Sequence, residues 1–197
     1  MLVVGCGPAG LTAAIALAKQ GIRVLAITKH PQLAPTPRAH VTNQRTFEIF
    51  RDLGIEDEAR KFATGYDRMP QAIFMRTLVG VEIGRIWGLG QEAAAKPVSP
   101  CSLADLPQNL LEPVLLQAAL RFGANVRFST ELTSFEQDDQ QVIAKIVDRL
   151  SGDTYTIAAS YMVGADGGNS RVAKLLNLPL EGAGELAGVS TFSSIAI

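Results

Sequence analysis

The stretch VVGCGPAGLTAAIALAKQG, residues 3–21, carries the strongest fold signal of the chain. A short apolar stretch precedes three glycines, Gly5, Gly7 and Gly10, and an alanine-rich segment follows them. The continuous apolar character predicts a buried strand at residues 1–5 and a buried helix over 8–21. Because glycine loses more backbone freedom on folding than any other residue, three glycines at this spacing need a structural reason.

The glycines form the pattern Gly-x-Gly-x-x-Gly between a predicted strand and a predicted helix. Gly5 permits a tight turn, Gly7 lets the backbone approach a pyrophosphate, and Gly10 lets the helix pack closely on the strand. Pro8 and Ala9 begin the helix, whose N-terminal N–H groups and partial positive charge attract phosphate groups. The pattern therefore predicts a dinucleotide-binding site.

A second apolar strand, IRVLAIT at residues 22–28, completes a βαβ unit with a parallel, right-handed crossover. In dinucleotide-binding units an acidic residue at the end of this strand usually bonds the ribose hydroxyls. Here Thr28 holds that position and Lys29 follows it. Thr28 can bond a hydroxyl but brings no charge, which argues against NAD and leaves FAD open.

The remaining chain predicts an alternation of helices and strands. A proline-containing loop is expected at 29–40, and a three-stranded β-meander around residues 131–159. Helices are expected at 42–54, 55–63 and 107–123, an antiparallel hairpin at 72–78 and 81–87, a short strand at 125–128, and a strand, glycine turn and helix over 161–176.

Composition narrows the class of protein. The 197 residues are 47% apolar and carry a net charge of −1, which gives no sign of a nucleic-acid or membrane partner. No apolar run approaches the roughly 20 residues of a membrane span, and no basic region precedes an apolar stretch at the N-terminus. Cys6 and Cys101 form neither a disulfide framework nor a metal-ligand spacing. We therefore expect a cytoplasmic α/β protein without a metal.

Three further stretches accompany the glycine pattern: TPRAHVTNQRTFEIFRDLGIEDEA at 36–59, DLPQNLLEPVLL at 105–116 and YMVGADGGNSRV at 161–172. In this order and at these distances they resemble the FAD-dependent aromatic hydroxylases, the single-component flavoprotein monooxygenases related to p-hydroxybenzoate hydroxylase. The resemblance runs from residue 1 to residue 197. It is closest to the phenol and 2,4-dichlorophenol hydroxylase branch, in which a Thr-Lys pair follows the second strand.

The resemblance implies an FAD/NAD(P)-binding Rossmann-like domain of three layers, with a β-meander and part of an antiparallel substrate-domain sheet. The implied parts are a first FAD-binding segment at 1–71, a substrate-domain segment at 72–100, a second FAD-binding segment at 101–182, and the start of a truncated substrate domain at 183–197. A third family fingerprint, a Gly-Asp pair leading into a helix, has no counterpart after residue 182. We therefore expect a fragment that binds FAD weakly or not at all and does not hydroxylate by itself.

The resemblance also assigns cofactor contacts beyond the glycine turn, Thr28 and Lys29. Arg38 matches an arginine that approaches the flavin, and Gln108 matches a glutamine at the start of the long helix that contacts the cofactor. Gln44 is a further expected cofactor contact. Asp166 belongs to a second fingerprint, an Asp-Gly pair that touches FAD and the route of NADPH. Arg171 belongs to the same fingerprint, either as a ligand contact or as a residue that bonds Asp166 and holds the turn.

His40 is the candidate catalytic residue. It aligns with a loop position where phenol hydroxylases carry an aspartate that takes the phenol proton. An imidazole titrates near neutral pH, which suits this task, because a phenol becomes a better nucleophile on losing its proton. The alternative is a loop histidine that caps or packs. His30 has no such context, and we expect it to be exposed.

The implied reaction has two stages. NADPH reduces FAD, and the reduced flavin reacts with O2 to give a C4a-hydroperoxide that hydroxylates a phenol, chlorophenols included, ortho to its hydroxyl.

The resemblance is compatible with a homodimer of the full-length form. Two alternatives stay open: a non-catalytic nucleotide-binding remnant, supported by the absent C-terminal part, and an NAD-dependent dehydrogenase, against which Thr28 and the pair Asp166–Gly167 argue.

Overall fold

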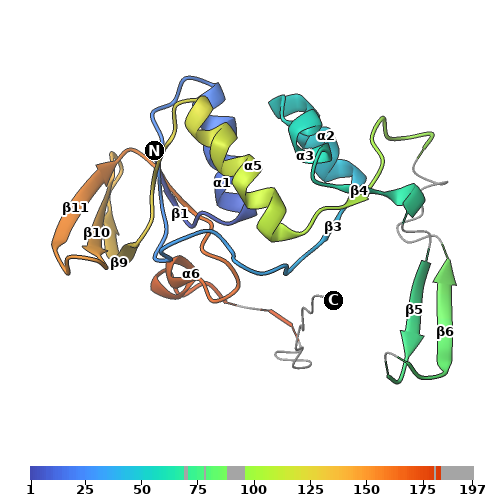
Figure 1. Cartoon of the computed structure of the whole chain (residues 1–197). Helices are drawn as coiled ribbons and strands as arrows, with labels where there is room; N and C mark the ends of the chain where they lie inside the picture. Colours follow the sequence, from blue (N-terminus) through green and yellow to red (C-terminus); the bar gives the residue numbers. More distant parts are fainter. Residues whose placement is uncertain (69–70, 78, 88–95, 180, 183–197) are drawn as a thin grey trace. The chain divides into compact units, whose positions relative to one another are not determined.

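The computed structural model describes residues 1–68, 71–77, 79–87, 96–179 and 181–182. The chain divides into two compact units: unit 1 comprises Met1–Arg38 and Leu115–Ile197, and unit 2 comprises Ala39–Val114 (Figure 1). The predicted start of a substrate domain at 183–197 lies outside the described residues. The other domain boundaries stay a prediction.

Unit 1 is built on a parallel sheet, as the sequence predicts. Its strands are β1 (Leu2–Val4), β2 (Leu25–Ile27), β8 (Asn125–Arg127) and β12 (Met162–Gly164), in the order β12-β1-β2-β8. β2 begins three residues later than the apolar run suggests. The reason is that the N–H of Ile22 still bonds Leu17 at the end of the preceding helix.

The helix after the glycine turn is α1 (Pro8–Lys19). Gly7 is its N-cap and Pro8 its first residue, where the missing N–H of proline has no cost. Gln20 is the C-cap, and Gly21 follows with a left-handed φ of 75°. The buried residues lie on one face of the helix: Gly10, Leu11, Ala14, Ile15 and Ala18.

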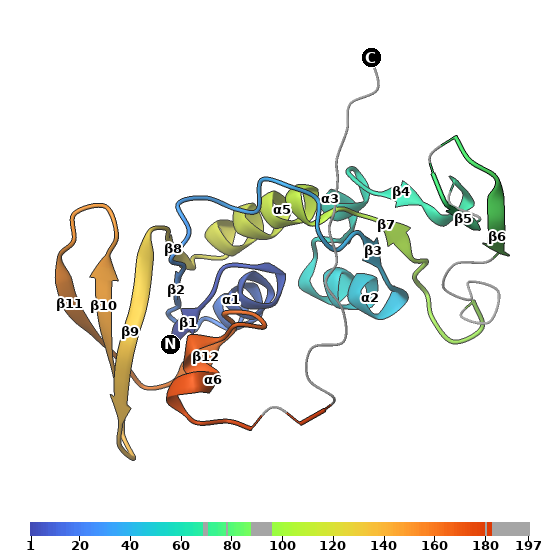
Figure 2. The same cartoon turned by 90° about the horizontal axis from the view of Figure 1, so that it is seen from below.

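The predicted three-layer arrangement with a β-meander is confirmed. The meander consists of β9 (Thr130–Gln137), β10 (Val142–Asp148) and β11 (Thr154–Ala159), all antiparallel. One face of the parallel sheet packs on it through a core of Leu2, Val4, Ile27, Leu132, Ala144, Ile146 and Val172. Because side chains alternate along a strand, the buried Val3 and Ala26 point to the opposite face of the sheet. The helix α1 lies against β1 and β2 (Figure 2).

Unit 2 contains the helices α2 (Gln44–Leu53) and α3 (Glu56–Arg60), a 3₁₀-helix η1 (Tyr66–Arg68), and a small sheet of β3 (Val41–Thr42), β7 (Ala104–Asp105) and β4 (Thr64–Gly65). Asn43 caps α2: its side chain accepts the Thr46 N–H at 2.9 Å. Gly54 ends α2 with a φ of 76°. The apolar side chains of α2 are buried, with the rings of Phe47 and Phe50 edge to face.

The predicted hairpin is present as β5 (Gln71–Met75) and β6 (Glu82–Trp87). Much of its apolar surface is exposed, including Phe74 at 51% and Ile83 at 65%. The last long helix, α5 (Gln108–Arg121), contains Pro113 and is followed by Gly123 with a φ of 92°. A short helix, α6 (Arg171–Leu175), follows β12 in unit 1.

Candidate cofactor and catalytic site

The cofactor residues of unit 1 follow the parallel strands. The carboxyl ends of parallel strands lie at one edge of a sheet, where α/β proteins commonly bind nucleotides. Gly5 follows β1, Thr28 follows β2, and Asp166 comes two residues after β12. The sheet therefore brings together the glycine turn and the Asp-Gly fingerprint, which are about 160 residues apart in the sequence.

Close backbone packing explains two of the three glycines. Gly5 has a φ of 111°, and a Cβ there would overlap the carbonyl oxygen of Ala165 and lie 2.9 Å from Cα of Asp166. A Cβ on Gly10 would overlap the carbonyl oxygen of Gly5. These contacts agree with the tight turn and the close helix packing expected at these positions. They also place the second fingerprint directly against the first.

The N-terminus of α1 supplies unused donors. Gly7 makes no side-chain cap, and Leu11 is the residue whose N–H bonds back to the Gly7 carbonyl, at 2.9 Å. The N–H groups of Ala9 and Gly10 precede that bond, so they have no partner within the helix. Such donors, together with the helix dipole, suit an anion such as a pyrophosphate.

Asp166 caps α6. One carboxylate oxygen accepts the hydroxyl of Ser170, and the other accepts the main-chain N–H groups of Arg171 at 2.6 Å and Val172 at 3.3 Å. The Ser170 hydroxyl in turn accepts the Ala173 N–H at 2.9 Å. Asp166 thus holds the fingerprint turn. A carboxylate has about four acceptor positions, so it retains capacity for a further donor.

The guanidinium of Arg171 is directed toward the meander. It lies 3.4 Å from Glu131, which also pairs with Arg149, and it donates to the carbonyl of Thr133 at 3.5 Å. Its main-chain N–H, rather than its side chain, bonds Asp166. The holding role is therefore carried by the backbone, and a ligand contact of the side chain stays a prediction.

His40 in unit 2 forms a pair that the sequence analysis missed. Its Nδ1 lies 3.0 Å from the carboxylate of Asp105, with side-chain exposures of 56% and 29%. β3 and β7 create the pair, because Val41 is opposite Asp105 and the N–H of Leu106 donates to the His40 carbonyl. With Nδ1–H donated to Asp105, Nε2 is left as a proton acceptor. The 65-residue separation gave no sequence signal for this contact.

The remaining predicted contacts lie in different settings. The main-chain N–H of Gln108 donates to Ala39 at 2.9 Å, and its amide donates to Glu112 at 2.6 Å. Gln44 is the half-buried first residue of α2. Arg38 is exposed and has no hydrogen-bond or ion-pair partner among the residues that the structure describes. Arg38 is therefore available to an external anion.

A charged cluster in unit 2 supports the fold rather than chemistry. The carboxylate of Glu56 accepts a hydrogen bond from Arg51 at 2.5 Å and another from Arg60 at 3.0 Å. The hydrogen bond from Arg51 is the main cause that lowers the pKa of Glu56. Burial, and then the Glu56 charge, raise the pKa of the Cys101 thiol. A thiol held protonated is a poor nucleophile, which agrees with a structural role for Cys101.

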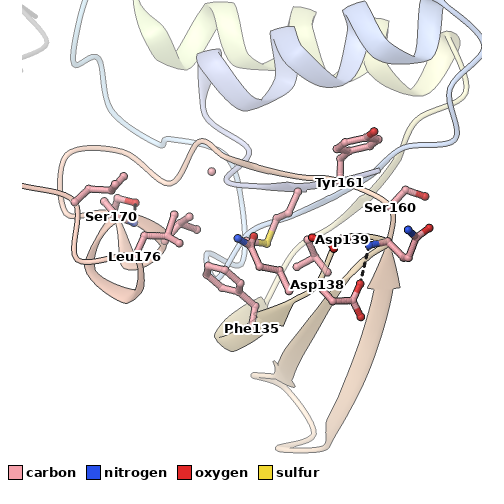
Figure 3. Close-up of a pocket in the computed structure, with 15 residues that line it drawn as sticks. Phe135, Asp138, Asp139, Ser160, Tyr161, Ser170 and Leu176 are labelled. Atoms are coloured by element: carbon pink, nitrogen blue, oxygen red, sulfur yellow. Dashed lines mark hydrogen bonds between the residues drawn. The ribbon is translucent and has the colours of Figure 1, made fainter.

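A cavity of about 580 Å³ lies elsewhere in unit 1 (Figure 3). It is lined by the turn between β9 and β10, by β12 and by α6, with Phe135, Tyr161 and Leu176 among its apolar residues. Asp138 closes the turn by accepting the Gln140 N–H at 2.8 Å. None of the predicted site residues lines this cavity, so the cofactor prediction rests on the sheet edge instead.

Comparison with protein families identifies the class. The FAD binding domain family matches residues 1–195, so the chain belongs to this family. This confirms the resemblance that the sequence motifs indicate. In the described part of the chain, no helix is long and apolar enough to cross a membrane.

Curated relatives are aromatic hydroxylases. The chain is 50% identical to 2,4-dichlorophenol 6-monooxygenase of Cupriavidus pinatubonensis over 186 residues, which are 92% of this chain and 31% of that protein. It is 46% identical to phenol 2-monooxygenase of a Pseudomonas species, over 88% of this chain and 29% of that protein. The chain thus spans less than a third of the length of these relatives.

Solved structures share the fold. The flavin-dependent monooxygenase PieE, in complex with FAD and substrate, is 45% identical with a TM-score of 0.86, over 92% of this chain and 32% of that one. Aklavinone-11 hydroxylase, in a ternary complex with FAD and aklavinone, is 36% identical with a TM-score of 0.78, over 89% and 34%.

Proposed function

We propose that the chain supplies the FAD-binding part of an NADPH-dependent flavoprotein monooxygenase that hydroxylates phenols, chlorophenols included, at the ortho position. One observation carries this proposal: the glycine turn that begins α1 packs directly against the Asp166 turn at the carboxyl edge of the parallel sheet. The similarity to proteins named phenol and dichlorophenol monooxygenases supports the choice of substrate class.

The chemistry of the unit 1 residues fits FAD. The N–H groups at the start of α1 would hold the pyrophosphate, and Thr28, with Lys29 beside it, would meet the adenosine ribose. Arg38 is a further proposed contact in unit 1, and the FAD contacts of Gln44 and Gln108, which belong to unit 2, stay predictions. When bound, FAD supplies the redox chemistry, accepting electrons from NADPH and activating O2.

The pair of His40 and Asp105 would remove the phenol proton. Asp105 accepts Nδ1–H and fixes the tautomer, so Nε2 of His40 can accept the proton of a phenol placed beside it. The resulting phenolate is more electron-rich at its ortho carbon. His40 acts as the base in this proposal, and Asp105 is a positioning residue.

The setting of the enzyme follows from the same class. We propose the cytoplasm as its location and a homodimer as the assembly of the longer form. Its partners would be small molecules, a phenol and O2. A net charge of −1 gives no general attraction to nucleic acid or to anionic membranes.

Two proteins test the proposal: the 197-residue chain, and a chimaera in which it replaces the matching part of 2,4-dichlorophenol 6-monooxygenase. We expect the chimaera to bind FAD, with quenched flavin fluorescence, and to hydroxylate dichlorophenol. Ala9→Glu, which puts a negative charge at the exposed start of α1, should weaken FAD binding at least about tenfold. Ala16→Glu adds the same charge at an exposed position further along α1 and serves as the control.

The outcomes separate the alternatives. A folded chimaera that binds no FAD would contradict the proposal. Tight NAD binding without flavin binding would favour a dehydrogenase. FAD binding by the chimaera but not by the 197-residue chain would support the proposed role and show that the chain forms only part of the cofactor site.

A further inference from the structure

The exit of β2 fixes Thr28 in place. Thr28 is only 8% exposed. Its main-chain N–H donates to the carbonyl of Arg127 at 2.9 Å, and its carbonyl accepts the N–H of Thr130 at 2.8 Å. Both backbone groups are therefore used between β2 and the segment after β8. The side chain is held at the sheet edge where a dinucleotide ribose binds in this class of fold.

The hydroxyl of Thr28 has one unused hydrogen-bonding direction. Its oxygen accepts the His30 N–H at 3.3 Å, and no described residue accepts its proton. A hydroxyl can both accept and donate, so this proton is available to a ligand oxygen at the sheet edge. A ribose hydroxyl has the lone pairs to accept this proton. Thr28 would thus act as a neutral donor, whereas a carboxylate at this position can only accept.

The charges around Thr28 favour anions. The exposed cations Lys29 and Arg127 are close to it in the strand ends, and residues 26–30 and 125–130 contain no aspartate or glutamate. Glu131, the next acid along the chain, is paired with Arg149 and Arg171. A carboxylate at the end of the second strand repels a ribose 2′-phosphate, whereas a nearby cation accommodates it.

We propose that Thr28 determines the specificity of the adenosine end of the site and makes it accept adenosine 2′-phosphates as well as unmodified adenosine. This inference rests on the dinucleotide site of the proposed function. NADPH belongs to the accepted class, because its adenosine carries a 2′-phosphate. NADPH would therefore compete with FAD for the flavin-free protein.

Two small probes test this without flavin. Adenosine 5′-monophosphate and adenosine 2′,5′-bisphosphate, titrated calorimetrically into the 197-residue chain, should bind with dissociation constants within about threefold, or more tightly for the bisphosphate. Adenosine 3′,5′-bisphosphate controls for total charge. Thr28→Asp should weaken binding of the 2′,5′-bisphosphate at least about tenfold relative to binding of the monophosphate. Thr156→Asp, on the exposed face of β11, should leave that ratio unchanged.

A second variant guards against a failure of Thr28→Asp to fold. Thr28→Val keeps the side-chain shape and removes the hydroxyl donor. The affinity for each probe should therefore fall about fivefold, and the ratio of the two dissociation constants should stay unchanged. A wild-type preference above tenfold for the monophosphate, or no binding of either probe, would overturn the inference. In one outcome the 197-residue chain binds both probes, but the chimaera, purified without FAD, binds no flavin. That outcome would count against the proposed function and leave this inference standing.

Discussion

At the scale of single residues, the pair of His40 and Asp105 makes the sharpest prediction about activity. Asp105→Asn in the chimaera should lower the hydroxylation rate with phenol about tenfold or more, because Nδ1 loses the carboxylate that fixes the tautomer. The hydroxylation rate with a polychlorinated phenol should fall much less, because this substrate is already ionised in solution and needs no base. Rates with both substrates under saturating conditions provide the measurement.

The control is Asp57→Asn, which removes an exposed carboxylate from α3 in the same unit. It should leave both rates unchanged. Equal losses with both phenols in Asp105→Asn would indicate a purely structural role and contradict the assignment of His40 as the base.

Glu56 makes a prediction about stability and pH. The hydrogen bond from Arg51 lowers the pKa of Glu56, so its stabilising effect is present above the unfolded value of about 4.3 and is lost as the pH falls through the lower folded value. Glu56→Gln should reduce the free energy of unfolding by about 1–2 kcal/mol at pH 7 and by much less near pH 3. Urea unfolding followed by circular dichroism measures both; an equal deficit at the two pH values would contradict the prediction.

Single residues also show what the sequence could and could not reveal. The glycine pattern and His40 could be singled out as candidates because they lie in continuous motifs. Asp105 was not, although it stands in a quoted motif, because its contact depends on pairing between two-residue strands. Such short strands have no periodicity to detect, and tertiary packing alone sets their register.

At the scale of elements, the junction between β1 and α1 can be tested through glycine. Gly10→Ala should lower the free energy of unfolding by about 2–3 kcal/mol, because the added methyl overlaps the Gly5 carbonyl oxygen. Gly168→Ala is the matched control: its added methyl meets open space, and the change should stay within about 0.5 kcal/mol. Equal effects in urea unfolding would show that the packing argument is wrong.

Elements with strong local signals were predictable from the sequence. α2 has Asn43 and Gly54 at its ends, and the meander strands are separated by turn residues. The extent of β2 was overestimated, because Ile22 and Val24 resemble strand residues in sequence, whereas the N–H of Ile22 still bonds the Leu17 carbonyl at the end of α1. Apolar character identifies burial, and hydrogen bonding decides where a strand begins.

At the scale of the whole molecule, the exposed apolar side chains of the β5–β6 hairpin predict self-association. Val81 is 85% and Ile83 65% exposed, and a two-stranded sheet also has unpaired edges. The 197-residue chain should associate as its concentration rises, and Val81→Thr with Ile83→Thr should reduce this. Sedimentation velocity measures it; Leu150→Thr, an isolated exposed residue at 83%, should change nothing.

The pairing of β1 with β12 has a consequence for synthesis of the protein. Leu2 pairs with Met162 of β12, which is the last strand of this sheet to be synthesised. One edge of β1 therefore stays unpaired until β12 has been made. At about 5–20 residues per second, β12 is made roughly 7–27 s after β2. During that interval the nascent chain presents an open apolar strand edge, which makes it a natural client for a chaperone bound near the ribosomal exit.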